Sequence, residues 1–298
     1  MRQVVITADD LGIAVETNRA VEVAHRDGIL TSASIMTNMP AFLDAVALLH
    51  RNPGLGTGVH LVLTSGRPVS SPDRVPLLVN RNGIFRYGYV GLSRLMIGPS
   101  RAAALVQIHE ELGAQIEKAA QAGLEIDHID GHRHVHMIPA IWPTVVGLAR
   151  DCGVVVRNSR ERLGWDQWHR DRARNLVKTL LLRAFARAND AIAVPQVEFA
   201  GLLDSGCVNV RVLRRLLRDL PTGTSEIVTH PSYAVRSDSR LCCSAEDAVF
   251  LKSRGRVSEL AALTNAKLRD ILEEEGLKTV SFRSCVRVPA VSAAGLRR

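Results

Sequence analysis

The sequence of 298 residues lacks the features that mark secreted, disulfide-rich or membrane-spanning proteins. Its five cysteines show neither zinc-ribbon spacing nor a secreted disulfide framework, so we expect mostly reduced cysteines that serve in packing. The longest apolar runs fall well short of the roughly 20 residues that span a bilayer. The N-terminal MRQVVITADD has the pattern of a strand followed by acids and not that of a signal peptide, so we expect a cytoplasmic protein.

Lysine and aromatic residues are also scarce. The net charge of +8 rests on 33 arginines and five lysines, and aromatic residues make up 4% of the chain. A basic chain can bind nucleic acid, but no zinc finger, aromatic RNA-binding motif or recognition-helix pattern is present, so we predict no nucleic-acid partner. Arginines concentrate in residues 159–189, near Trp165 and Trp168. This segment is either a solvated helical face or a surface that contacts an anionic membrane or a lipid-linked sugar, which would make the protein peripheral to the membrane.

Short apolar runs alternate with longer segments of helical periodicity, which predicts a parallel sheet built from βαβ units. We expect strands at residues 3–7, 32–36, 58–63, 126–130, 154–157, 226–229 and 279–282. Helices are expected at 14–26, 41–50, 101–122, from about 140 to 151, from 172 to 189 and at 258–275. We expect one domain over residues 1–285, with insertions at 65–99 and 159–222 and a flexible tail at 286–298.

Residues that can bind metals or move protons follow four of these strands. They are Asp9 and Asp10, His60, the segment from Asp127 to His136, and His230. In a parallel α/β fold the carboxyl ends of the strands carry the loops that build active sites. Each has a plainer interpretation: the two acids could cap a helix, and His60 could be a hydrogen-bonded core residue. His230 precedes a proline at a loop entry, where it could act as a general acid.

The segment DHIDGHRHVH at residues 127–136 is the most specific of these features. Imidazole nitrogens and carboxylate oxygens are ligands for borderline or hard divalent cations, which predicts a metal site. A catalytic ion usually has about three protein ligands, so some of these histidines would instead orient ligands or contact substrate. A polar loop whose histidines bond to the backbone is the alternative.

Four motifs together, ADDLG, GVHLVL, HIDGHRHVHM and THP, resemble those of the YdjC/ChbG-type carbohydrate deacetylase family. The resemblance covers residues 2–157 well and 225–283 more loosely. The HpnK-like branch associated with hopanoid biosynthesis is also similar. The family resemblance implies an α/β fold, a distorted TIM-like (β/α) barrel of parallel strands with flanking helices. It also implies metal-dependent removal of an N-acetyl group from an amino sugar such as N-acetylglucosamine, within an oligosaccharide or a lipid-linked sugar.

The resemblance also assigns roles to residues. It implies one divalent ion, Mg or Zn, bound by Asp10, His60 and His132, with Asp9 as the general base and His230 as the proton donor to the leaving amine. Residues expected to orient ligands or contact the substrate are Asp130, His128, His134, His136 and Arg157. Two alternatives remain open, namely a metal-dependent hydrolase of an ester or phosphoester and a non-catalytic sugar-binding relative. The sequence also leaves a homodimer open.

Overall fold

The computed structural model describes residues 1–163, 172–235 and 243–285. Its centre is a fully parallel sheet in the order β5-β4-β3-β2-β1-β7-β6, with β8 paired to the start of β1. The strands are β1 (Arg2–Leu11), β2 (Ser32–Ile35), β3 (Gly56–Leu61), β4 (Ile126–Gly131), β5 (Val155–Val156), β6 (Glu198–Ala200), β7 (Gly223–Thr229) and β8 (Leu277–Thr279). From its third position onward β1 is buried along its whole length, because neighbouring strands and covering helices enclose it on every side.

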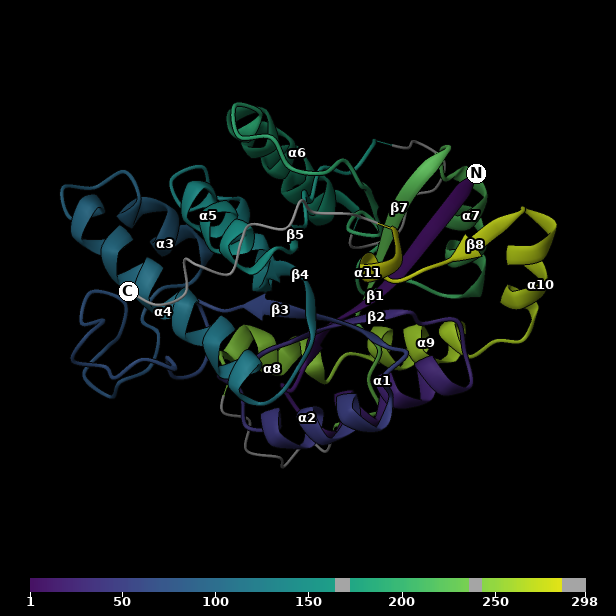
Figure 1. Cartoon of the computed structure of the whole chain (residues 1–298), viewed down its shortest axis with the longest axis horizontal. Coiled ribbons are helices and arrows are strands. Elements are labelled where there is room, and N and C mark those ends of the chain that lie inside the picture. The colour runs from purple at the N-terminus through teal and green to yellow at the C-terminus, as the bar shows by residue number, and fades with distance from the viewer. Residues whose placement is uncertain (164–171, 236–242, 286–298) are drawn as a thin grey trace.

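Helices cover the outside of this sheet. They are α1 (Val15–Arg26), α2 (Phe42–Arg51), α3 (Tyr89–Leu95), α4 (Arg101–Gln121), the 3-10 helix η1 (His132–Met137), α5 (Trp142–Cys152), α6 (Arg172–Asn189), α7 (Val210–Asp219), α8 (Ala245–Leu251), α9 (Arg254–Leu263), α10 (Lys267–Glu274) and α11 (Phe282–Cys285). In Figure 1 the strands lie in the middle, with α1, α2 and α9 along one side and α5 and α6 on the other. The apolar core fills the space between the strands and these helices.

The sheet curls until its two edges approach each other. Beyond β5 the chain continues to Glu161, which forms a parallel bridge with Phe199 in β6. This bridge brings the edge that begins at β5 to the edge formed by β6, so the strands form a distorted and nearly closed barrel. The expected distorted (β/α) barrel is therefore confirmed.

Several boundaries differ from those expected. Strand β1 continues through the two acids to Leu11, and the expected insertion at residues 65–99 contains α3. The expected helix at 258–275 is wrong, because the chain forms α9 and α10 with a break between them. At the break the side-chain oxygen of Asn265 accepts a hydrogen bond from the backbone N–H of Lys267 at 3.1 Å. Asparagine competes in this way with the helical backbone bonds and starts a new helix.

The C-terminal part of the expected topology also needs correction. The last strand ends at Thr279 instead of continuing to Phe282, which begins α11. Strand β6 and helices α7 and α8 were not predicted individually. Strand β6 is only three residues long, α7 lies within the expected insertion at 159–222, and the capping pair of Ser244 and Asp247 at the start of α8 was not recognised.

Other expectations concern cysteines, membranes and the basic segment. Among the described cysteines, Cys152 is exposed, so packing does not explain that residue. Within the described ranges no helix is long and apolar enough to cross a membrane. The helix expected from residue 172 is confirmed as α6, whereas Trp165, Trp168 and the tail at 286–298 lie outside the described residues.

The neighbouring strands β3 and β4 generate a stability prediction. A Cβ atom at Gly58 would lie 2.2 Å from Nε2 of His128, whose ring is held by Asp127 and Ser34. Because that ring cannot move away freely, we expect Gly58→Ala to lower the free energy of unfolding by about 1–3 kcal/mol. Urea unfolding measures the change. Gly113→Ala on α4, where the nearest atom would be 3.9 Å away, is the matched control and should be neutral or stabilising. Equal stability of the two variants would contradict this packing account.

Candidate metal centre and active site

Asp9 and Asp10 lie at the carboxyl end of β1, and both line one cavity. Consecutive strand residues normally point to opposite faces, but Asp10 has a left-handed backbone with φ of 67°. The turn that follows is fixed by Asn18, whose side-chain oxygen accepts from the backbone N–H of Gly12 at 2.7 Å. The N-cap residue of α1 is Ala14, which makes no side-chain capping hydrogen bond. The interpretation of the two acids as caps of this helix is therefore wrong.

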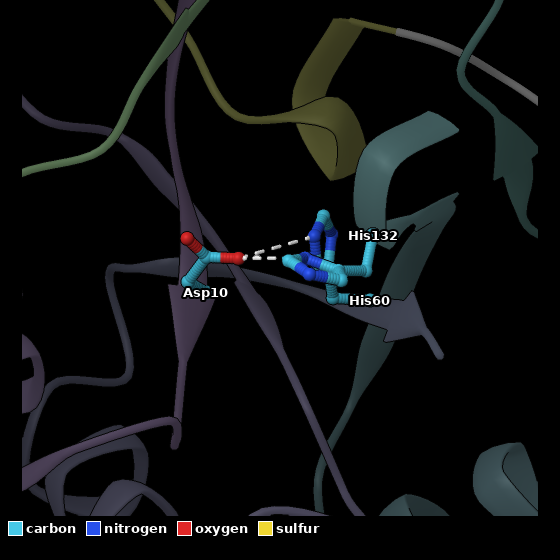
Figure 2. A group of neighbouring side chains, drawn as sticks. All are labelled: Asp10, His60 and His132. Atoms are coloured by element: carbon cyan, nitrogen blue, oxygen red, sulfur yellow. Dashed lines mark hydrogen bonds and ion pairs between the residues drawn. The ribbon is translucent and has the colours of Figure 1, made fainter. Parts of the chain in front are cut away.

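Asp10, His60 and His132 converge from β1, β3 and the start of η1 (Figure 2). Oδ1 of Asp10 lies 3.1 Å from Nδ1 of His132 and 3.5 Å from Nε2 of His60. Each of the three can offer one ligand atom, and these atoms lie within 4.8 Å of one another. All three side chains are buried. The group could therefore hold a metal ion.

In His60 and in His132, the ring nitrogen that does not face Asp10, here called the outer nitrogen, contacts a carboxylate. Nδ1 of His60 is 2.7 Å from Asp130, its register partner on β4, and Nε2 of His132 is 2.9 Å from Asp247 on α8. A carboxylate on the far side of the ring is the usual arrangement of a metal-binding histidine. The donor set therefore fits a divalent ion. Asp9, His60 and Asp130 form a second possible group, but Arg157 bonds to both of its acids, and its positive charge would oppose a cation.

Arg157, at the end of β5, joins three buried carboxylates. It makes two 2.8 Å hydrogen bonds to Asp9, one on each carboxylate oxygen, and its guanidinium lies 2.7 Å from Asp130 and 2.6 Å from Glu226. Burial alone would lower the pKa of Arg157, but Asp130, Asp9 and Glu226 outweigh burial and raise it well above its usual value. Arg157 was expected to orient ligands or contact the substrate, and in this structure it orients Asp9 and Asp130.

A second buried arginine holds Asp10. Nη1 of Arg256, on α9, donates to Oδ2 of Asp10 at 2.7 Å. Burial would raise the pKa of Asp10, but Arg256 and His132 outweigh it and keep that pKa well below the usual range. Asp10 is therefore ionised at neutral pH, as a metal ligand must be.

The other expected histidines have different surroundings. His128 is fully buried among Ser34, Asp127 and Phe282, and it does not line the cavity. His134 lines the cavity, and its Nδ1 lies 2.9 Å from the hydroxyl of Ser159. Nε2 of His136 donates to the backbone carbonyl of Arg157 at 3.0 Å. Of these three histidines, only His134 thus lines the cavity, whereas His128 and His136 are buried outside its lining.

His230 follows β7 and faces the same cavity. Its backbone N–H donates to Glu259 at 2.5 Å, and its ring meets the ring of Phe250 edge-on at 5.3 Å. Burial lowers the pKa of His230 to about 4, so the ring is neutral at neutral pH. Its Nδ1 atom is buried and forms no hydrogen bond with the described residues.

The cavity has a volume of about 480 Å³ and two kinds of wall. Its polar wall contains the acids and histidines described above. Its apolar wall includes Val177, Leu181 and Leu182 of α6, together with Leu202 and Phe250. Val177 is 68% exposed and Leu181 is 40% exposed, so this wall continues to the molecular surface.

A family model for YdjC-like proteins matches residues 3–274. The chain belongs to this family. It is 33% identical over 285 residues to a carbohydrate deacetylase of Brevibacillus brevis, covering 94% of this chain and 98% of that protein. A carbohydrate deacetylase of Geobacillus stearothermophilus is 31% identical, with 95% of this chain and 97% of that protein covered. A chitooligosaccharide deacetylase of Salmonella paratyphi B is 28% identical, with 94% and 98% covered.

A solved structure supports the fold of this YdjC-like protein. It is a protein of Enterococcus faecalis V583 named for cellobiose-phosphate cleavage. It superposes with a TM-score of 0.73 at 22% identity, covering 95% of this chain and 98% of the other.

Sequence reasoning missed Glu226, Asp247 and Arg256. A charged residue inside the apolar strand pattern around Glu226 could have drawn attention to it. Asp247 is hidden, because Ser244 and Asp247 have the spacing of a helix-capping pair, and Ser244 does accept the backbone N–H of Asp247. Arg256 is one of 33 arginines and no local feature distinguishes it.

The arrangement around Arg157 predicts a pH-dependent loss of stability. Arg157→Leu leaves buried acids without their partner, which should cost about 3–5 kcal/mol at pH 7. Burial would raise the pKa of Asp130, but Arg157 and His60 lower it below its value in the unfolded chain. Asp130 therefore contributes stability above about pH 4, and this contribution is lost as the pH falls. Urea unfolding should show the gap between wild type and variant shrinking below about pH 4.

The control is Arg162→Leu, because Arg162 is 71% exposed and pairs at the surface with Glu198. It should change the free energy of unfolding by no more than about 1 kcal/mol. A gap for Arg157→Leu that stays constant from pH 7 to pH 3.5 would contradict the ion-pair account.

Proposed function

We propose that this YdjC-like protein is a metal-dependent carbohydrate N-deacetylase. The observation that carries the proposal is the division of the two adjacent acids of β1. Asp10 faces His60 and His132, whereas Asp9 is held by Arg157, and both line one cavity with His230. Asp10 is thus available to bind a metal ion, and Asp9 is available to accept a proton. The deacetylase names of relatives matched over nearly the whole chain agree with this arrangement.

Asp10, His60 and His132 would hold the ion. When bound, a divalent ion would supply Lewis acidity, which polarises an amide carbonyl and makes water easier to deprotonate. Two imidazoles and one carboxylate favour Zn²⁺ over Mg²⁺, because Mg²⁺ prefers oxygen ligands.

Asp9 is the proposed general base. Each of its oxygens accepts one hydrogen bond from Arg157 and keeps a further lone pair that can accept a proton from water. The bidentate contact also fixes the plane of the carboxylate, so the base does not have to be reoriented during the reaction.

His230 is the proposed donor of a proton to the leaving amine. Its ring is neutral before the reaction because burial lowers its pKa to about 4. It must therefore take up a second proton from solvent water during turnover, when negative charge develops beside it in the cavity, and it then passes this proton to the amine. Asp9 and Asp10 already raise the pKa of His230, and further negative charge would act in the same direction.

The apolar wall favours an N-acetylated sugar that carries an apolar group. The acetylated sugar would occupy the polar wall, and the attached group would lie along α6, where Val177 and Leu181 are exposed. The arginines of the basic segment support a membrane contact less well. Among the described ones, Arg162 pairs with Glu198 and Arg183 donates to the carbonyl of Glu161. Contact with an anionic membrane surface thus stays a prediction, whereas we propose a glycoconjugate substrate.

Amide hydrolysis is tested by amine release from N,N'-diacetylchitobiose and N-acetylglucosamine glycosides. We expect release that stops after removal of metal by a chelator and returns when Zn²⁺ is added back. Asp9→Asn and His230→Ala should each lower kcat by about 10²–10⁴-fold, because each removes a proton-transfer group but no metal ligand. Both should still bind Zn²⁺, whereas Asp10→Ala should not.

His109→Ala changes an exposed histidine on α4 and is the matched control. Turnover of an aryl acetate or aryl phosphate without amine release would favour the ester or phosphoester alternative. Sugar binding without any turnover would favour a non-catalytic relative.

The apolar wall can be tested separately. The double variant Val177→Ser and Leu181→Ser should raise KM for an alkyl glycoside of N-acetylglucosamine about tenfold, because about 1.4 kcal/mol of apolar contact is lost. KM for N,N'-diacetylchitobiose should change less than twofold. Leu43→Ser, on α2 and 77% exposed outside the cavity, is the control. Equal effects on both substrates would show that α6 does not contact the apolar group.

A further inference from the structure

Helix α8 reaches the candidate metal centre from a part of the chain that carries none of the family motifs. It begins after Ser244, and its third residue, Asp247, points at His132. Oδ1 of Asp247 lies 2.9 Å from Nε2 of His132, and both side chains are 7% exposed. The contact joins residues 115 positions apart in the chain.

Each oxygen of Asp247 accepts a hydrogen bond from another protein side chain. Oδ1 also accepts from Nη2 of Arg133 at 2.8 Å, and Oδ2 accepts from the hydroxyl of Ser244 at 2.8 Å. Asp247 is therefore not a member of the ligand group and acts on the site through His132.

Three further contacts fix the position of Asp247 itself. The guanidinium of Arg133 also bonds to Glu246 and to the hydroxyl of Ser244. The backbone N–H of Ser244 donates to the hydroxyl of Ser65 at 2.8 Å, which ties α8 to the loop after β3. Arg133 has a left-handed backbone with φ of 54°, a conformation that is kept only when surrounding contacts impose it.

We propose that Asp247 is a positioning residue for the metal site: it holds the outer nitrogen of His132 so that the inner nitrogen stays directed at Asp10. The pairing repeats the one between His60 and Asp130. Each imidazole ligand would then have its own carboxylate, which fixes the tautomer and the ring orientation and strengthens the nitrogen as a donor. The inference rests on the proposed metal-dependent function.

Titration of the metal-free protein with Zn²⁺ or Co²⁺ alone tests this role without relying on activity. We expect Asp247→Ala to weaken binding of both ions by about 10–100-fold. Asp247→Asn keeps the shape and one acceptor oxygen but loses the charge, and it should fall between wild type and Asp247→Ala. The visible absorption spectrum of bound Co²⁺ should also change in Asp247→Ala, because the orientation of His132 is no longer fixed.

Glu117→Gln is the control, because Glu117 is an exposed acid on α4 that bonds to Gln121 and does not line the cavity. It should leave affinity and spectrum unchanged. Melting temperatures of the metal-free proteins separate folding from binding, and circular dichroism verifies that each variant is folded before titration. Wild-type affinity and spectrum in Asp247→Ala would overturn the positioning role while leaving the metal site intact. A wild-type protein that binds neither ion would overturn both the role and the proposed function.

Discussion

The site depends on the burial of one guanidinium among three carboxylates. Arg157 connects β1, β4 and β7 through Asp9, Asp130 and Glu226, from its own position at the end of β5. Burying any of these charges alone would be costly, so the four are stable only together. The planar guanidinium suits this role, because its donors are directed at several carboxylates at fixed angles. The strands of the barrel therefore meet around this cluster of four charges. The same contacts fix the positions of Asp9 and Asp130 in the site.

The charge balance of this interior explains why a cation suits it. Within the described part of the chain, the guanidiniums that pair with Asp9, Asp10, Asp130 and Glu226 are those of Arg157 and Arg256. Without an ion, protons on the histidines compensate: burial would lower the pKa of His132, but Asp247 and Asp10 raise it to about 9. A divalent cation between Asp10, His60 and His132 would supply that positive charge instead. Protons and metal would then compete for the same nitrogens, as is general for imidazole ligands.

The candidate ligand residues and the supporting residues Asp130 and Arg157 could be predicted from the sequence and its family resemblance, but Asp247 and Arg256 could not. Asp10, His60 and His132 stand beside strand ends, where local pattern and topology together indicate a site. Asp247 and Arg256 lie on short helices whose place in the fold depends on tertiary contacts. The same limit applied to the fold: the alternation of elements predicted a parallel sheet of βαβ units, and the family resemblance implied the barrel. The three-residue β6 and the helix break at Asn265 depend on a bridge to Glu161 and on a side-chain hydrogen bond.

Backbone strain connects these supports to the proposed chemistry. The non-glycine residues described with a left-handed backbone are Asp10, Arg133 and His134, and all three line the cavity. Such conformations cost roughly 1–3 kcal/mol each and persist only where other contacts impose them. Here the imposing contacts are those of Asn18 with Gly12, of Asp247 with Arg133, and of Ser159 with His134. Stability of the surrounding barrel thus offsets the strain at Asp10, Arg133 and His134. Asn18 and Ser159 therefore help to hold the conformation of the site, although neither residue lines its cavity.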